Sequence, residues 1–477
     1  MTIQSINPAT EEVIETFEPH TAAHIDEILS TVAAAQKRWR DRSFAERADV
    51  LRRVAALLRE RKDELAHAAT SEMGKPIAES EAEVEKCAWV CEYYAEGAER
   101  FLADEQAPST ATESYVAYRP LGVLLAIMPW NFPYWQALRA AAPALMAGNA
   151  VILKHASNVT RCALHIERLF TDAAPDTIFR TILAPGSQVE ALIADRRIAA
   201  VTLTGSDAAG VAVASAAGRA LKKTVLELGG SDAFIVLEDA DLDAAAQMAV
   251  RARFQNTGQS CIAAKRFIVV EGVAEDFERK FVEAAAKLKV GDPLDRAMQI
   301  GPVARGDLRE TLADQVKKSV AMGAKVALGG ESVAGSGGKG YFYAPTILTH
   351  VTDEMPVFRE ETFGPAAAVI HARDAEHAVE LANDSDFGLG GNLWTRDLTR
   401  ARELASRLES GGVFINGMTA SDPRLPFGGV KRSGYGRELS LVGIREFVNV
   451  QTVWIGPAAS APGQQAAVQQ PVTANVE

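Results

Sequence analysis

Four apolar runs of strand length in the middle of the chain constrain its fold most strongly. They read LGVLLAIMPW, NAVILKHA, IAAVTLTGS and TVLELGG, and helical patterns such as VTRCALHIERLF separate them. Strands that are apolar throughout are buried on both faces, as in a parallel sheet covered by helices. A second series of this kind runs from DAFIVLED to GGVFIN. The sequence therefore predicts an α/β protein with two lobes, each built on a parallel sheet.

Composition and charge indicate a globular chain and exclude several functional classes. Hydrophobic residues make up 48% and charged residues 23% of the 477 residues, which is enough chain for more than one domain. The formal net charge of -12 argues against a nucleic-acid partner. No window has the apolar length of a membrane span, and MTIQSINPATEEVIE does not resemble a secretory signal. We therefore expect a cytoplasmic protein.

The N-terminal part of the chain predicts helices, whereas its end predicts no regular structure. Apolar residues recur at helical spacing from residue 21, again through residues 51–65, and in a third helix over roughly residues 79–101. Cys87 and Cys91 lie four residues apart on the third helix, which fits core packing better than a metal site. The four cysteines are too few for a disulfide framework, and we expect no metal. Residues 457–477, rich in Pro, Ala and Gln, predict a flexible tail.

Polar segments follow several of the apolar strands, where ligands bind in open α/β sheets. In PWNFP (129–133), the amide of Asn131 can donate to an oxyanion, although a turn asparagine is the simpler explanation of an isolated Asn. In LKHAS, Lys154 either binds a ribose or phosphate or is simply solvated. In LTGSDAAG, Gly205 and Gly210 flank a helix start that can hold a pyrophosphate, but two glycines alone are weak evidence.

Two further residues complete a candidate catalytic set. Glu227 interrupts the apolar strand of LELGG, where burial would raise its pKa toward that of a general base; a paired structural glutamate is the alternative. Cys261 ends the polar run QNTGQSC (255–261) instead of lying among aliphatic residues, which leaves its thiol reachable. Together with Asn131, and with a nucleotide-compatible loop between them in the sequence, these residues suit a covalent oxidation through a thioester.

This combination of motifs resembles the aldehyde dehydrogenase superfamily. The resemblance extends from INPAT at 6–10 to QTVW at 451–454, through PWNFP, TGS, LELGGSDAFIV, QNTGQSC, EETFGP and PFGGVKRSGYGRE. The bacterial succinate-semialdehyde dehydrogenase branch is the most similar, with LKHAS and SDPRLPFGGVK in common. The resemblance implies two Rossmann-like parallel-sheet lobes, one for the cofactor and one for catalysis, plus a small β oligomerisation element.

The resemblance also implies how the chain divides into domains. The cofactor-binding domain would comprise residues 1–113, 133–228 and 425–447, and the catalytic domain would comprise residues 229–424. Residues 114–132 and 448–456 would form the oligomerisation element of a homodimer or homotetramer.

The same comparison assigns roles to individual residues. Cys261 would attack the aldehyde carbonyl, and Asn131 with the Cys261 backbone N–H would stabilise the oxyanion. Glu227 would activate the water that hydrolyses the thioester. The expected contacts of an NAD(P) cofactor are Ile127, Trp130, Lys154, Ser157, Gly205, Ser206, Gly210, Leu228, Glu361 and Phe363.

Ser157 departs from the NAD-preferring pattern of the family. Many relatives have a glutamate at this position, which would bind the adenosine ribose and repel a 2′-phosphate. Serine removes that charge and leaves Lys154 free to pair with the phosphate. We therefore predict NADP as the preferred cofactor and NAD as the alternative.

The substrate prediction depends on one basic residue. Arg139 lies eight residues after Asn131 on the helix that NFPYWQALR opens, and it suits an aldehyde with a distal carboxylate. Ser421 is its expected partner, while Phe132 and Trp135 would line the same passage unless they serve only packing. These residues favour succinate semialdehyde as the substrate.

Other substrates and another class of protein stay open on the sequence alone. Gln255 stands where some succinate-semialdehyde dehydrogenases have a second arginine. Glutarate semialdehyde is one methylene longer, which a pocket discriminates by only about 1–3 kcal/mol. Aliphatic or aromatic aldehydes are further alternatives if Arg139 is structural. A non-catalytic binding or structural protein on the same fold is the alternative of another class.

Overall fold

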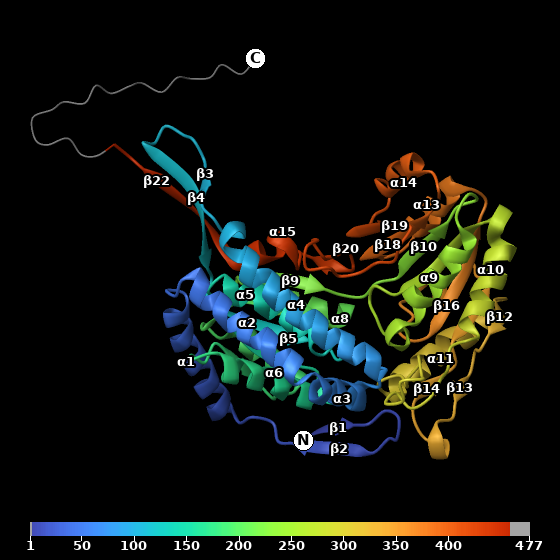
Figure 1. Cartoon of the computed structure of the whole chain (residues 1–477), viewed down its shortest axis with the longest axis horizontal. Helices are drawn as coiled ribbons and strands as arrows, with labels where there is room; N and C mark the ends of the chain where they lie inside the picture. The colour runs from blue at the N-terminus through green and yellow to red at the C-terminus, as the bar shows by residue number, and fades with distance from the viewer. Residues whose placement is uncertain (1, 458–477) are drawn as a thin grey trace, which may run out of the picture.

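Two β-sheets covered by helices form the two lobes of the molecule (Figure 1). The structure is a computed structural model that describes residues 2–457, so the expected tail from residue 458 onward lies outside the described residues. The α/β architecture predicted from the alternating strand and helix patterns is confirmed.

A six-stranded sheet is the centre of the first lobe, at the left in Figure 1. Its spatial order is β21 (Gly434–Tyr435), β9 (Lys223–Glu227), β8 (Ile198–Thr204), β5 (Val123–Met128), β6 (Ala150–His155) and β7 (Phe179–Thr181). All strands except β21 are parallel. The chain passes from β5 to β6 on one side and later returns to β8 on the other. Such a reversal opens a ligand-binding crevice at the carboxyl ends of the strands.

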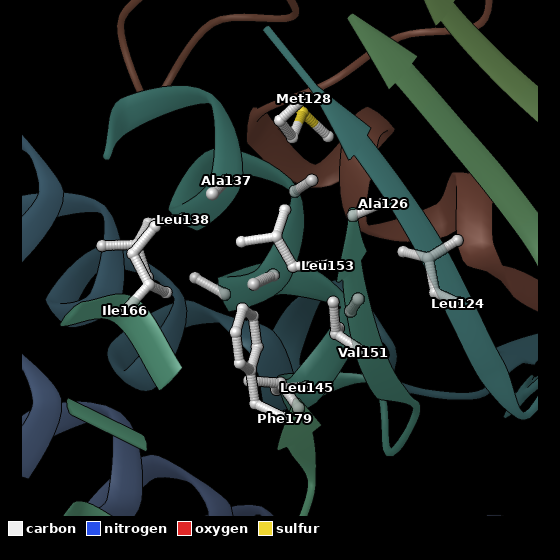
Figure 2. Close-up of a cluster of buried hydrophobic side chains, with 14 of the residues drawn as sticks. Leu124, Ala126, Met128, Ala137, Leu138, Leu145, Val151, Leu153, Ile166 and Phe179 are labelled. Carbon is white, nitrogen blue, oxygen red and sulfur yellow. The ribbon is translucent and has the colours of Figure 1, made fainter. Parts of the chain in front are cut away.

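Helices cover this sheet and bury its central strand β5 completely. Those that follow the strands are α5 (Trp135–Met146), α6 (Thr160–Ala173), α7 (Val189–Ala194) and α8 (Asp207–Arg219). Every residue of β5 is buried, as expected for an apolar strand with neighbours on both sides. Figure 2 shows this packing for Leu124, Ala126, Met128, Leu153, Leu138, Leu145 and Ile166.

Four helices of the N-terminal segment pack against the same lobe. They are α1 (Ala22–Trp39), α2 (Phe44–Glu60), α3 (Lys62–Met73) and α4 (Ile77–Phe101). The apolar run expected over residues 51–65 is divided between α2 and α3, because Arg61 leaves the helical conformation at φ -101° and ψ 17°. Gly74 ends α3 with a left-handed φ of +82°. Cys87 and Cys91 of α4 are buried in the core.

A seven-stranded sheet is the centre of the second lobe. Its order is β12 (Lys325–Leu328), β15 (Thr346–Thr349), β16 (Ala366–Ala372), β11 (Ala264–Val270), β10 (Asp232–Val236), β18 (Gly390–Trp394) and β19 (Gly412–Ile415). Only β12 is antiparallel. Side chains of β10 alternate between two cores, one against α11 (Gly306–Ala321), α13 (Ala375–Asn383) and α14 (Leu398–Ala405), the other against α9 (Leu242–Phe254) and α10 (Glu271–Ala285). Burial on both faces explains the apolar run of β10 after Asp232.

A three-stranded antiparallel sheet projects from the body of the molecule (Figure 1). In it, β4 (Glu113–Pro120) pairs along its length with β22 (Val448–Ile455), and β3 (Glu105–Gln106) forms the other edge. The structure differs here from the expected segment 114–132, because that segment also contains β5, which lies inside the six-stranded sheet. Since β5 is fully apolar, it needs cover on both faces, which a projecting ribbon cannot supply.

Short elements complete the fold. They are β1 (Ile3–Ile6), β2 (Val13–Phe17), β13 (Ser332–Val333), β14 (Phe342–Tyr343), α12 (Pro356–Arg359), β17 (Phe387–Gly388), β20 (Val430–Lys431) and α15 (Ser440–Ile444). None of the helices described is both long and apolar enough to cross a membrane. Within residues 2–457, His, Cys, Asp and Glu form no group of three that could hold a metal ion.

Candidate active site

The loop before β11 contains a strained turn that precedes Cys261. Asn256 (φ 54°, ψ 37°) and Thr257 (φ 55°, ψ 30°) adopt left-handed conformations inside the 3-10 segment Gln255–Gly258, and Gly258 follows with φ +72°. Left-handed backbone costs free energy for residues other than glycine, so the surroundings must hold this turn.

Buried hydrogen bonds hold the strained turn in place. The backbone N–H of Asn256 donates to Glu79 Oε2 at 2.6 Å, and its side-chain Nδ2 donates to Asn131 O at 2.8 Å. Gly258 approaches a second loop so closely that an added Cβ would lie 2.3 Å from Gly364 O. Gly258 therefore serves the close contact between two backbones.

The side chain of Cys261 lines a cavity of about 520 Å³. The cysteine is partly exposed, whereas the other three cysteines are buried. Burial of the thiol raises the pKa of Cys261 to about 12, and the charge of Lys265 opposes this rise. The resting residue is therefore a protonated thiol that needs a base before it can act as a nucleophile. The cavity wall also brings together the four expected substrate contacts, Phe132, Trp135, Arg139 and Ser421.

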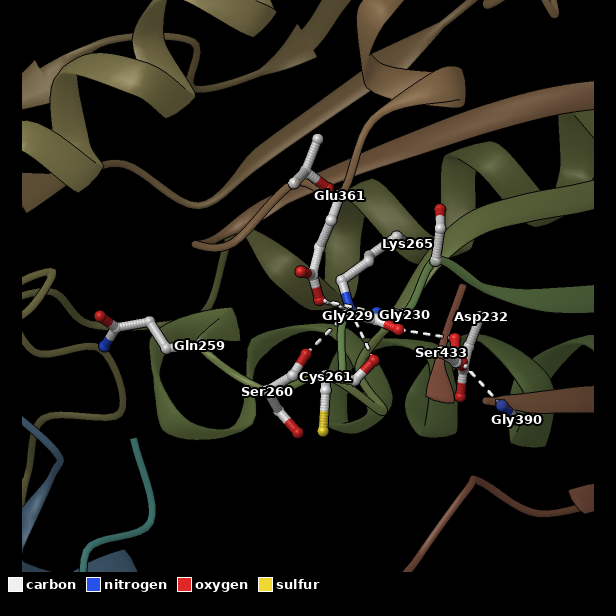
Figure 3. Close-up of polar contacts among 12 residues, drawn as sticks. Gly229, Gly230, Asp232, Gln259, Ser260, Cys261, Lys265, Glu361, Gly390 and Ser433 are labelled. Atoms are coloured by element: carbon white, nitrogen blue, oxygen red, sulfur yellow. Dashed lines mark hydrogen bonds and ion pairs between the residues drawn. The ribbon is translucent and has the colours of Figure 1, made fainter. Parts of the chain in front are cut away.

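Lys265 at the start of β11 ties the cysteine loop to the candidate cofactor site (Figure 3). Its buried Nζ donates to the carbonyls of Ser260 at 2.9 Å and Cys261 at 2.8 Å, and it lies 3.4 Å from Glu361 Oε1. The same Glu361 oxygen accepts from Gly230 N at 3.0 Å. Sequence reasoning missed Lys265, because nothing in AAKRFIVV distinguishes a buried lysine from one at a solvated strand end.

Asn131 lies beside the cysteine loop, although it does not itself line the cavity. Its Nδ2 donates to Gln259 O at 3.0 Å, and its Oδ1 accepts from Gln136 Nε2 at 3.1 Å. A side-chain amide has two N–H donors, so one stays available for another acceptor. These two contacts fix the orientation of the amide, which an isolated turn asparagine would not require.

Glu227 ends β9 as a buried carboxyl group that also lies outside the cavity wall. Neither of its carboxyl oxygens has a hydrogen-bond partner among residues 2–457. Burial and the nearby Glu438 carboxylate raise the pKa of Glu227 well above its usual range, while Arg139 opposes the shift. The paired structural glutamate considered as the alternative is therefore not what the structure contains.

Arg139 lines the cavity, but its charge is already paired. It forms a buried ion pair with Glu438, its guanidinium carbon lies 4.7 Å from the centre of the Phe427 ring, and Nη2 donates to Thr204 Oγ1 at 3.3 Å. Ser421, the expected partner of Arg139, instead accepts a hydrogen bond from Lys86 Nζ at 2.8 Å. Sequence reasoning missed Lys86, because its position in the helix predicted over residues 79–101 does not indicate that its side chain faces a cavity.

The residues expected to bind the cofactor lie mostly at the carboxyl edge of the six-stranded sheet. Ile127 of β5 pairs with Lys154 of β6 and with Leu203 of β8. Gly205 and Ser206 follow β8, and Ser206 Oγ caps α8 by accepting from Ala209 N at 3.4 Å. The free N–H groups at this helix start suit a pyrophosphate.

Other expected cofactor contacts close the same region. An added Cβ on Gly210 would lie 2.5 Å from Leu228, so this glycine lets α8 pack onto the end of β9. The rings of Trp130 and Phe363 meet edge to face with centres 5.6 Å apart. Glu361 and Phe363 come from the second lobe, so the expected cofactor set spans both lobes.

Lys154 and Ser157 lie where the cofactor preference was predicted to be decided. Burial lowers the pKa of Lys154, and within residues 2–457 it makes no ion pair. Ser157 is exposed at the start of a short 3-10 helix, Ser157–Val159. An unpaired lysine beside a neutral side chain fits a phosphate group.

Comparison with known proteins agrees with this geometry. Residues 1–453 match the model of the aldehyde dehydrogenase family. The chain belongs to the aldehyde dehydrogenase family. A relative from Escherichia coli strain K12, named a succinate semialdehyde dehydrogenase for NAD(P)+, is 53% identical over 451 residues, covering 94% of this chain and 97% of the relative. A probable succinate-semialdehyde dehydrogenase for NADP(+) from Synechocystis is 51% identical, over 95% of this chain and all of the relative.

Solved structures of aldehyde dehydrogenases have the same fold. A succinic semialdehyde dehydrogenase from Streptococcus pyogenes, determined in complex with NADP+ as the cofactor, superimposes with a TM-score of 0.92 at 38% identity. The match covers 95% of this chain and 100% of that chain. The family and fold expected from the motifs are confirmed.

Proposed function

We propose that this aldehyde dehydrogenase oxidises succinate semialdehyde to succinate through a thioester on Cys261, with NADP preferred over NAD. The proposal is carried by one observation, a partly exposed thiol on a cavity of about 520 Å³ whose wall combines apolar, aromatic and basic side chains. An apolar passage with a basic group suits a short aldehyde that ends in a carboxylate. The names of relatives at 53% and 51% identity support the same substrate.

The first half of the reaction joins the substrate to Cys261. The sulfur attacks the aldehyde carbon, the thiol proton passes to Glu227, and the C=O electron pair moves onto oxygen. The raised pKa of Glu227 makes its ionised form a stronger base toward a thiol whose own pKa is also raised. Neither Glu227 oxygen is held by a hydrogen bond, so the side chain loses none when it turns toward the sulfur. Asn131 Nδ2 and the Cys261 N–H then donate to the oxyanion.

The second half releases the acid. The oxyanion reforms the carbonyl as a hydride leaves the same carbon, which gives a thioester on Cys261. NADP, when bound, supplies the nicotinamide that accepts this hydride. Glu227 releases the thiol proton to solvent and becomes ionised again. Water then adds to the thioester carbon, and Glu227 takes its proton. The C–S bond breaks with its electron pair on sulfur, and the freed acid loses its proton to solvent as succinate. Glu227 returns its proton to the sulfur, which restores the Cys261 thiol.

The cofactor preference follows from charge at the adenosine end. Lys154 has no ion pair within residues 2–457, and Ser157 adds no negative charge beside it. A 2′-phosphate would pair with Lys154, whereas NAD leaves this partly buried ammonium without a counter-ion. At the other end of the cofactor, Glu361 is held by Lys265 and Gly230 N and would bind the nicotinamide ribose.

A panel of aldehydes with both cofactors tests the proposal. We expect the highest kcat/KM for succinate semialdehyde with NADP, above glutarate semialdehyde, butanal and benzaldehyde. Cys261→Ala should abolish turnover, and Glu227→Gln should slow both NADPH formation in the first turnover and hydrolysis of the thioester, because one carboxylate is the base in both steps. Lasting turnover by Cys261→Ala would refute the covalent route. A wild-type protein inactive toward every aldehyde would favour the non-catalytic alternative.

Assembly is part of the proposal. Val450, Trp454 and Ile455 of β22 expose apolar side chains on the projecting three-stranded sheet. Exposed apolar side chains in one strand favour contact with another protein surface. The protein therefore forms a homodimer or a dimer of such dimers through this sheet. Light scattering should show a smaller species for Trp454→Glu, and a wild-type monomer would contradict this assembly.

A further inference from the structure

Lys86 is a largely buried cation of the cavity wall that has no carboxylate partner. It comes from α4 and shares the cavity with Cys261. Its Nζ donates to Ser421 Oγ at 2.8 Å and lies 4.1 Å from the centre of the Trp135 ring. Among residues 2–457 it forms no ion pair, and burial lowers the pKa of Lys86 to about 8. A buried charge is costly unless it is paired, so an anion that reached Nζ would be bound favourably.

The acidic residues near Lys86 are already held by other groups. Glu83 pairs with Lys75, and its Oε1 accepts at 2.9 Å from two backbone N–H groups at the start of α5. Asp422 accepts from Arg424 at 2.7 and 2.9 Å. Neither carboxylate can move to Lys86 without leaving another cation or buried N–H unpaired.

The other two cations of the cavity wall suit a substrate carboxylate less well. Arg139 is buried against Glu438, so a second carboxylate would have to share or displace that partner. Its positive charge also lowers the pKa of Lys86, an effect that Cys87, Glu83 and Asp422 oppose. Arg251 is exposed, and an ion pair of a solvated arginine contributes little.

We propose that Lys86, together with the Ser421 hydroxyl, binds the distal carboxylate of the substrate and selects an ω-carboxy aldehyde over an uncharged one. This inference rests on the proposed function, because it names the group that recognises its substrate. An ammonium has three N–H donors, of which Ser421 uses one. The indole N–H of Trp135 has no acceptor within the described residues and is a further donor in the wall.

Charge-dependent kinetics test the assignment. We would measure kcat/KM at pH 7 for succinate semialdehyde and for butanal, which has the same carbon chain without the carboxylate. Lys86→Met should lower the value for succinate semialdehyde about 10- to 100-fold, mostly through KM, and change the value for butanal by less than about twofold. Lys86→Arg should retain most of the preference. The matched control Arg251→Gln removes another cation of the same wall and should alter neither value.

The outcomes separate this inference from the proposed function. Equal losses on both aldehydes in Lys86→Met would overturn the assignment and leave Lys86 a packing role against Trp135. Loss of the preference in Arg251→Gln alone would place the carboxylate at Arg251. Should Lys86→Met fail to bind NADP, Lys86→Gln provides the same comparison with a polar side chain. A wild type that oxidises butanal but not succinate semialdehyde would refute the proposed substrate itself.

Discussion

Replacing Gly258 with alanine tests how accurately the turn before Cys261 has to be placed. The new Cβ would lie 2.3 Å from Gly364 O, whereas ordinary contacts begin at 3.4 Å, so the two loops must separate by about 1.1 Å. Gly364 cannot yield easily, because the buried Arg253 donates to the same carbonyl. The left-handed φ of +72° adds about 1–2 kcal/mol of backbone strain for alanine. A misplacement of about 1 Å near a reacting group can lower a rate about 100-fold.

The assay combines turnover with the reactivity of the thiol. We expect kcat for succinate semialdehyde to fall about 100-fold in Gly258→Ala. Iodoacetamide labelling reports on Cys261 directly, since the other three cysteines are buried, and its rate should change as well. A change in both kcat and the labelling rate indicates that the thiol of Cys261 has moved. A change in kcat alone indicates that the substrate site is damaged.

Two glycines elsewhere provide matched controls. Gly323 has φ +114° with no atom within 4 Å of an added Cβ, so Gly323→Ala carries the strain without the clash. Gly218 lies in α8 with equally open space, and Gly218→Ala should stabilise by about 0.5–1 kcal/mol. Both controls should keep full kcat. A folded Gly258→Ala protein with kcat within about twofold of wild type would refute the reasoning.

Three further predictions address charges in the site. Lys265→Met removes the charge that most lowers the pKa of Cys261, so iodoacetamide labelling at pH 8 should slow about 10-fold; an unchanged rate would contradict this role. Ser157→Glu should lower the ratio of kcat/KM for NADP over NAD at least 10-fold, and an unchanged ratio would argue against the charge explanation. The preference for succinate semialdehyde over butanal should fall as pH rises through about 8, because Lys86 then loses its positive charge. Burial also raises the pKa of Glu79, another residue of the cavity wall, to about 7, so Glu79 becomes negatively charged above that pH and would also weaken binding of the substrate carboxylate. Lys86→Arg keeps its charge and should therefore retain the preference above pH 8. If the preference falls in Lys86→Arg as it does in the wild type, Glu79 is the group responsible.

The candidate catalytic residues stand out in the sequence because each interrupts a strong local pattern. Glu227 interrupts an apolar strand, and Cys261 ends a polar loop. Asn131 follows a second apolar strand and lies between two prolines. These signals depend on residues close in sequence, and the structure brings the three residues to one region. The boundary of the projecting sheet was less predictable, since β4 and β5 are neighbouring strands that differ only in which surfaces cover them.

The assignment of the basic residues shows what local sequence cannot supply. Arg139 and Lys86 both occupy helices, and both have charges that suit a carboxylate. Which of them lacks a counter-ion depends on partners far along the chain. Arg139 pairs with Glu438, whereas Lys86 donates to the hydroxyl group of Ser421, 335 residues away, and lies over the Trp135 ring. Separating a buried cation from its counter-ion is costly, whereas a buried cation without a counter-ion is available to a ligand. The side chain that recognises the substrate is therefore decided by the pairing that the complete fold allows, which favours Lys86 over the arginine that spacing alone would choose.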